Sequence, residues 1–183
     1  MRKLILIRHG NTPKNNRTPQ RGLTKEGVKR IMETSKMLRK EVSGMKSCLI
    51  LSTPTNRAIL TADILTSELK ISQRGLENLR INNLSKLAKS LDDVKLRRGN
   101  LSNYYWAISN YEEVGVESTI EFAKRVEVII SGYFEKGFEC IILVTHEISL
   151  ETIVRYSEMY SLMWKSYEDT SDYGDFAVME LSS

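Results

Sequence analysis

Short apolar runs recur along the chain and predict buried strands. Three of them contain almost no polar residue, which is typical of strands that helices cover on both faces. The fourth is more mixed and suits a position at the edge of a sheet. The predicted strands span residues 3–8, 48–52, 140–145 and 176–181.

Between these runs, apolar residues recur three and four positions apart, which is the spacing of one helix face. Residues that favour helix starts mark where these segments begin. Thr24 stands before the first segment, and Thr53 with Pro54 opens the second. Ser118 and Glu121 form a capping box before the third. The predicted helices span residues 24–43, 54–69, 119–136 and 147–160.

This alternation of strands and helices favours an α/β fold, namely a three-layer α/β/α sandwich around a mostly parallel sheet. The length suits one domain, so we expect residues 1–183 to fold as a single unit. Residues 78–115 fit the alternation least well. They predict either a small helical insertion that forms a lid above the strand ends, or a helical pair whose aromatic side chains pack on the body.

The chain has only two histidines, His9 and His146, and each comes just after a predicted strand. If both strands are parallel, both imidazoles emerge at the carboxyl edge of the sheet, where α/β proteins bind ligands. Arg8 precedes His9, and Arg57 falls in the first turn of a predicted helix. A cation there suits a phosphate that also faces the helix N-terminus. Each residue alone has an ordinary structural explanation, but the combination predicts a phosphate site, where Gly10 would let the backbone approach the ligand.

The overall charge is compatible with an anionic ligand but does not indicate a nucleic-acid partner. The net charge is +4 and the pI about 9.0. A nucleic-acid binder gathers Lys and Arg into a stripe, and the densest basic stretch, residues 95–98, is short. The chain has no Walker loop or kinase motif, which disfavours nucleotide-dependent phosphoryl transfer.

The cysteines and the amino-terminal segment indicate whether the chain binds a metal and where in the cell it is located. Cys48 and Cys140 each begin an apolar run, so we expect both to be buried. No Cys or His pair has the close spacing of a metal site, so none is expected. The apolar run at residues 4–7 is too short for a signal peptide or a membrane span, which predicts no membrane association and a cytoplasmic location.

Three segments carry a specific resemblance. They read LILIRHGNT, LSTPTNRAILTA and LVTHE, and they occur in this order after predicted strands. Together they resemble the histidine phosphatase superfamily, also called phosphoglycerate mutase-like, and the similarity spans roughly residues 4–62 and 115–150. Asn15, the stretch at residues 22–27 and the stretch at residues 115–118 are similar to further family motifs.

The resemblance implies a mechanism that needs no metal or cofactor. His9 would attack the phosphorus, and Arg8, Arg57 and His146 would hold the phosphoryl oxygens. Asn15 would assist. The substrate-binding residues that we expect are Asn15, Thr12, Gly10 and Glu147.

The resemblance also implies a carboxyl group that protonates the leaving oxygen, and two residues compete for this role. Glu77 is the nearest match to the acid of the small-phosphatase branch. Glu147 stands beside His146, where the acid phosphatase and phytase branch carries its acid. Of the two, the sequence favours Glu77.

The leading functional hypothesis is a phosphatase that acts on a phosphorylated small molecule or a phosphoprotein, including phosphohistidine. A cofactor-dependent phosphoglycerate mutase is the alternative, although Lys14 stands where that group typically has Trp. A non-catalytic phosphate-binding module is a third reading, which the nucleophile His9 disfavours. The sequence carries no signal for the oligomeric state.

Overall fold

The computed structural model describes residues 2–13, 20–84, 108–160, 164–165 and 174–181. In these residues six strands form one sheet in the order β3-β2-β4-β1-β6-β5, and the sheet is mostly parallel. The first four strands in this order run parallel, and β6 and β5 add antiparallel pairings. The strands are β1 (Arg2–Arg8), β2 (Cys48–Ser52), β3 (Gln73–Leu76), β4 (Cys140–Thr145), β5 (Trp164–Lys165) and β6 (Phe176–Leu181).

All four predicted strands are present, and the structure adds two. β3 has the sequence Gln-Arg-Gly-Leu and lies exposed at one edge, so it lacks the apolar run that marks a buried strand. β5 has only two residues, which is too short for any pattern. Because β5 pairs with β6, the expectation that residues 176–181 form the edge is wrong.

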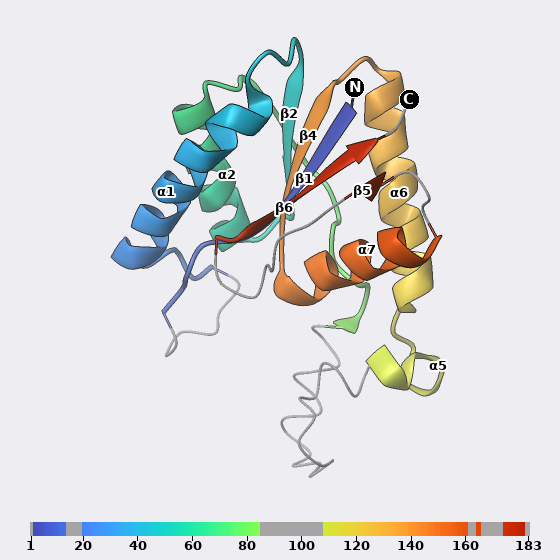
Figure 1. Cartoon of the computed structure of the whole chain (residues 1–183). Coiled ribbons are helices and arrows are strands. Elements are labelled where there is room, and N and C mark those ends of the chain that lie inside the picture. The colour runs from blue at the N-terminus through green and yellow to red at the C-terminus, as the bar shows by residue number, and fades with distance from the viewer. Residues whose placement is uncertain (1, 14–19, 85–107, 161–163, 166–173, 182–183) are drawn as a thin grey trace.

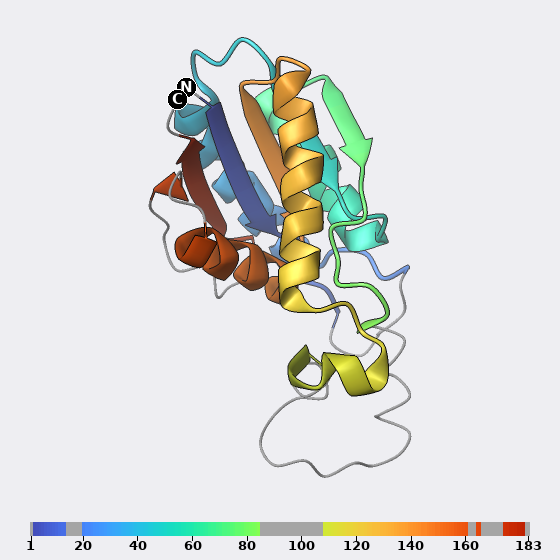
Figure 2. The ribbon, with the colours of Figure 1, turned by 90° about the vertical axis from the view of Figure 1, so that its right-hand side faces the viewer.

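Helices cover both faces of the sheet, as predicted. Figures 1 and 2 show α1 (Lys25–Val42) and α2 (Asn56–Leu69) on one side and α6 (Thr119–Glu135) and α7 (Glu147–Tyr160) on the other. The short helix α5 (Tyr111–Val114) lies beyond the carboxyl ends of the parallel strands. Within the described residues, no helix has the length and apolar character needed to cross a bilayer.

The register of the central strands explains the two cores. Along β1, Leu4 and Leu6 join the core under α6 and α7, while Ile5 and Ile7 join the core under α1 and α2. Because side chains alternate along a strand, a continuous apolar run fills both cores. Cys48 and Cys140 are register partners in neighbouring strands; Cys140 is buried as expected, but Cys48 is only half-buried.

Helix starts follow the sequence signals in two of three cases. The Thr24 hydroxyl accepts a hydrogen bond from the Gly27 N–H at 2.9 Å. The predicted capping box at Ser118 is present. The second helix begins at Asn56 rather than at residue 54, with Thr55 in the N-cap position. Thr53 is not a cap because its N–H still bonds to a carbonyl of β4, so the strand geometry continues past Ser52.

The segment predicted as an insertion belongs partly to the body. Leu79, Ile81 and Leu84 are buried in the core under α6 and α7. Three of the first seven residues of the range 78–115 therefore belong to this core, whereas Asn78, Asn82 and Asn83 are exposed. Residues 85–107, which carry most of the aromatic side chains in this segment, lie outside the described residues. 

Candidate active site

The two histidines lie side by side at the carboxyl edge of the sheet. β1 and β4 are parallel neighbours, and Arg8 pairs in register with Thr145. The residues that follow are His9 and His146, so both imidazoles leave the sheet at the same level. Their ring centroids are 5.0 Å apart, and the ring planes meet at 69°.

Arg57 connects the two rings. Its Nε donates a hydrogen bond to Nε2 of His9 at 2.9 Å. Its Nη2 lies 3.1 Å from Nδ1 of His146 and donates to it, because a guanidinium can only donate. The side chain comes from the start of α2 and is nearly buried, as is expected for a cation that serves a site rather than the surface.

These contacts fix the position of the proton on each imidazole. Nδ1 of His9 is 2.9 Å from the carbonyl oxygen of Gly10, which only accepts, so Nδ1 carries the proton. Nε2 of His9 therefore carries the lone pair, which accepts the hydrogen bond from Arg57. In His146 the proton lies on Nε2, which donates to the Thr53 hydroxyl at 3.2 Å.

Both imidazoles are neutral at physiological pH. Burial, followed by the nearby Arg57, Arg8 and Arg21 guanidinium groups, lowers the pKa of His9 to about 3, although the Gly10 carbonyl partly opposes this. Burial, with His9 and Arg80 next, lowers the pKa of His146 well below its usual range. A neutral imidazole keeps the lone pair that a nucleophile needs.

The turn after β1 is held by α1 and α2. The Gly10 N–H donates to the Thr61 hydroxyl at 3.0 Å, and that hydroxyl donates to the Arg57 carbonyl at 2.8 Å. A Cβ at Gly10 would lie 3.0 Å from Ile31 and 3.1 Å from the Gly27 carbonyl oxygen. Gly10 therefore allows the turn to pack closely on α1. The sequence suggested that Gly10 would approach the ligand, but it is not among the residues that line the pocket.

The histidines open into a pocket of about 230 Å³. Arg8 and Glu147 form an ion pair in it, with Nη2 and Oε2 at 2.6 Å. Among the described residues, no group of three or more His, Cys, Asp or Glu side chains is placed to hold a metal ion. The lining residues are Arg8, His9, Arg21, Arg57, Arg80, Ile81, Leu84, His146, Glu147, Ile148 and Ser149.

The structure does not bring every expected residue to this pocket. Glu77 accepts a hydrogen bond from the Tyr133 hydroxyl at 2.8 Å and is not part of the lining, so the preference for Glu77 over Glu147 is not supported by geometry. Tyr133 lies on α6, which draws the Glu77 carboxylate towards that helix. Thr12 is buried without lining the pocket. Asn15 lies outside the described residues.

Sequence reasoning also missed residues that the structure places at the site. Thr53 contacts His146 although its position suggested a helix cap. Thr61 belongs to the Arg-Ala-x-x-Thr-Ala stretch, and its fixed distance from Arg57 was an available signal. Arg80 lines the pocket from the loop after β3, and no motif marks it.

Comparison with known proteins identifies the family of this chain. A family model described as the histidine phosphatase superfamily (branch 1) matches residues 4–168. The chain belongs to this superfamily. The matched range includes both histidines and every residue that lines the pocket. A search of curated proteins gave no significant match.

Solved structures with a similar fold include two phosphatases and a phosphoglycerate mutase. A candidate α-ribazole-5'-P phosphatase from Escherichia coli has a TM-score of 0.63 at 18% identity, over 97% of this chain and 90% of the other. A phosphoglycerate mutase from Bacillus anthracis has a TM-score of 0.59 at 18% identity, over 100% and 92%. A mycobacterial glucosyl-3-phosphoglycerate phosphatase has a TM-score of 0.58 at 17% identity, over 88% and 81%. At these identities the similarity establishes a shared fold.

Proposed function

We propose that the protein is a phosphatase that hydrolyses phosphomonoesters through a phosphohistidine on His9. The observation that carries this proposal is the unprotonated Nε2 of His9, which accepts a hydrogen bond from Arg57 in a pocket lined by arginines. A phosphoryl group is anionic, and its transfer depends mainly on positioning and on stabilisation of charge. The substrate would be a phosphorylated small molecule or a phosphoprotein.

In the first step, Nε2 of His9 attacks the phosphorus, and the bond to the leaving oxygen breaks. The Arg57 guanidinium, which donates to Nε2 before substrate binds, would turn its donors to the phosphoryl oxygens and release the lone pair. Arg8 and His146 would bind the same oxygens. Bidentate guanidinium contacts suit this role.

Glu147 would supply the proton that the leaving oxygen takes up. It is the carboxyl group that the described residues contribute to the pocket lining, and it begins α7 directly beside His146. Arg8 forms an ion pair with it. A bound phosphoryl group would compete for Arg8, which would let Glu147 take up a proton and act as a general acid.

In the second step, water attacks the phosphorus of phosphohistidine. Glu147, now a carboxylate, would accept a proton from this water, and the bond between phosphorus and nitrogen breaks. Inorganic phosphate leaves, and His9 returns to its neutral form. No step of this reaction calls for a metal ion or a cofactor.

The proposal is tested with a panel of phosphomonoesters and a His9→Ala variant. We expect the unchanged protein to release phosphate and His9→Ala to fall to background. Rapid quenching with ³²P-labelled substrate should trap acid-labile phosphate on the unchanged protein only. Met37→Ala, an exposed change on α1, is the control and should keep full activity.

Two results would contradict the proposal. Activity that survives in His9→Ala would exclude His9 as the nucleophile. Interconversion of 3-phosphoglycerate and 2-phosphoglycerate that is faster than phosphate release would instead identify a mutase.

A further inference from the structure

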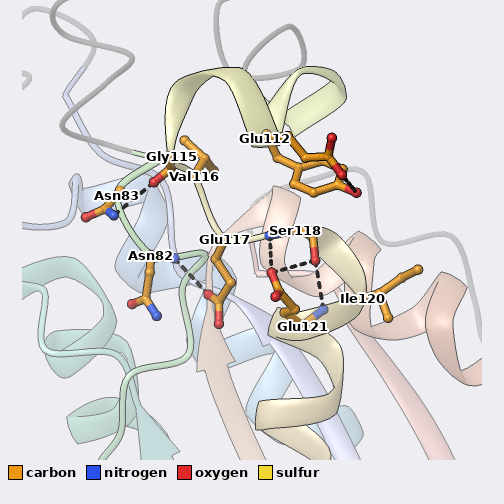
Figure 3. Close-up of a pocket in the computed structure, with 10 residues that line it drawn as sticks. Asn82, Asn83, Glu112, Gly115, Val116, Glu117, Ser118, Ile120 and Glu121 are labelled. Carbon is orange, nitrogen blue, oxygen red and sulfur yellow. Dashed lines mark hydrogen bonds between the residues drawn. The ribbon is translucent and has the colours of Figure 1, made fainter.

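Two acidic side chains at the start of α6 are engaged within the protein. They line an open pocket between α5 and α6, which Figure 3 shows. Glu117 pairs with Arg125 at 2.8 Å and accepts a hydrogen bond from the Asn82 N–H at 2.9 Å. Glu121 closes the capping box by accepting hydrogen bonds from Ser118. These contacts stabilise the fold, whereas a pair of chemically reactive groups lies at the opposite edge of the sheet.

The reactive pair consists of Cys48 and Cys140, which are the only cysteines in the chain. They are the first residues of β2 and β4, two neighbouring parallel strands, and they pair in register. Both side chains contribute to the core under α1 and α2, so they leave the sheet on the same face. Because β2 and β4 end at the active site, the cysteines lie at the opposite edge of the sheet (Figure 1).

We propose that Cys48 and Cys140 form a modification site, at which a peroxide produces a reversible disulfide between β2 and β4. Neighbouring strands lie ~4.7–4.9 Å apart, which is within the ~4.4–6.8 Å that separates the Cα atoms of disulfide-bonded cysteines. Two cysteines in register on one face of a sheet meet this condition. The inference goes beyond the proposed phosphatase activity and does not depend on it.

The segments before the two strands hold the cysteines next to each other. The Cys140 N–H donates to the Ser47 carbonyl at 3.1 Å, and the Glu139 N–H donates to the same oxygen at 3.0 Å. The Ser47 hydroxyl donates to the Gly137 carbonyl at 2.7 Å. Since Ser47 directly precedes Cys48, these bonds tie the start of β2 to the start of β4.

The two thiols differ in exposure and in acidity. Cys140 is buried, whereas Cys48 is half-buried and more accessible to a small oxidant. A hydrogen bond from the Cys140 thiol lowers the pKa of Cys48, although burial and Glu139 oppose this. The same bond and burial raise the pKa of Cys140, which Lys3 opposes only in part. Cys48 is therefore the thiolate that reacts first, and Cys140 is the resolving thiol.

The reaction with hydrogen peroxide has two steps. The Cys48 thiolate attacks one peroxide oxygen, so that an S–O bond forms and the O–O bond breaks. The hydroxide that leaves takes up the proton released by the thiol, which gives water and a sulfenic acid. The Cys140 sulfur then attacks the Cys48 sulfur, the S–O bond breaks, and the oxygen leaves as water with the Cys140 proton. The two thiols together lose two electrons, which the peroxide gains.

The disulfide would act on stability rather than on the active site. It would close a loop of about 90 residues that contains α2 and α6. A cross-link of this kind restricts the unfolded chain and therefore favours the folded state. Because the histidines follow the other ends of β1 and β4, forming the bond does not require them to move.

The test uses the whole folded chain. The reduced protein is treated with a small excess of hydrogen peroxide, unfolded in urea with N-ethylmaleimide and analysed by mass spectrometry. We expect two maleimide adducts before oxidation and none after it, together with a proteolytic product that joins Cys48 to Cys140. Dithiothreitol should restore both adducts. The midpoint of urea unfolding should shift upwards in the cross-linked protein.

Two single variants separate the roles of the thiols. In Cys140→Ser, Cys48 lacks its resolving partner, so dimedone should trap a sulfenic acid on Cys48. In Cys48→Ser, the buried Cys140 should form a sulfenic acid at least about tenfold more slowly, because its pKa is raised. Peroxide should not raise the urea midpoint of either variant.

Several results would overturn the inference. Two adducts that persist after oxidation of the folded protein would show that no disulfide forms, and so would a sulfinic acid on Cys48 without a cross-link. Disulfides between two molecules in place of one within the chain would show that the register does not bring the thiols together. A lower urea midpoint in the cross-linked protein would show that the sheet does not accommodate the bond. A sulfenic acid that forms faster in Cys48→Ser than in Cys140→Ser would contradict the assigned roles.

Discussion

Neighbouring groups place the proton on each imidazole. The Gly10 carbonyl holds the proton on Nδ1 of His9 and leaves Nε2 as the nucleophile. Arg57 and Thr53 impose the opposite tautomer on His146. A carbonyl can only accept and a guanidinium can only donate, so each ring has one neutral form that satisfies its partners.

Single substitutions can show whether Glu147 or Glu77 is the general acid. Glu147→Gln should lower kcat for alkyl phosphates by about 10²–10⁴, because a general acid contributes roughly this much. The loss should be smaller with 4-nitrophenyl phosphate, whose leaving phenolate needs little protonation. Steady-state kinetics on both substrates would measure the difference.

Glu77→Gln is the matched control for this experiment. Its carboxylate accepts from the Tyr133 hydroxyl outside the pocket lining, so kcat should stay close to that of the unchanged protein on both substrates. A large loss in Glu77→Gln with normal activity in Glu147→Gln would restore the assignment that the sequence favoured.

Helices α1 and α2 position the site through the turn that follows β1. Thr61 on α2 binds the Gly10 N–H, and Gly27 on α1 lies directly against Asn11. The distances leave no room for a side chain at Gly27, and a side chain at Gly10 would require its neighbours to shift. The packing of two helices therefore fixes the loop that carries His9.

Gly27→Ala tests this packing. The added Cβ would lie 2.4 Å from the Asn11 carbonyl oxygen, which belongs to the backbone and cannot rotate away. Overpacking of this kind costs about 1–3 kcal/mol, which exceeds the roughly 1 kcal/mol that Ala gains over Gly inside a helix. We expect a lower free energy of unfolding, measured with urea, and weaker phosphatase activity.

Gly132→Ala is the control, and it should change the free energy of unfolding in the opposite direction. Gly132 lies within α6, and a Cβ there would meet nothing within 4 Å. Only the higher helix propensity of Ala should then affect stability, and it should raise the free energy of unfolding by up to about 1 kcal/mol. If both variants changed stability in the same direction, the packing argument would be wrong.

The stability of the whole molecule should depend on the protonation of its two histidines. The pKa of His9 is about 3 in the folded protein and near 6.5 in the unfolded chain. Between these values the unfolded chain binds the additional proton, so acid favours unfolding. The free energy of unfolding should fall as pH decreases from about 6.5 to 3, by up to about 1.4 kcal/mol per pH unit for each histidine that behaves this way.

Urea unfolding at several pH values would measure this slope, and His9→Gln should make it shallower. Other acid-sensitive groups contribute to both proteins, so the difference between the two slopes isolates His9. Identical slopes would mean that His9 titrates alike in the folded and unfolded states.

The sequence by itself determined the layered fold and the main partners at the site. Apolar runs marked β1, β2, β4 and β6 because these strands fill cores on both faces. The positions of His9 and His146 after two such runs predicted their convergence, since the ends of parallel strands share one edge. These features are local patterns combined with general rules of topology, so they can be read from one chain.

Only the tertiary structure decided which polar side chains face the pocket. Glu77 turns to Tyr133, while Arg80 reaches the site from the same loop. Nothing in the spacing of these residues distinguishes them, because the direction of a loop side chain depends on what packs behind it. Here the ion pair of Glu117 and Arg125 holds the backbone of that loop. Glu117 lies 35 positions along the chain from Asn82, which it binds, and Arg125 lies 45 positions from Arg80. Contacts between residues so far apart in sequence form only in the folded chain.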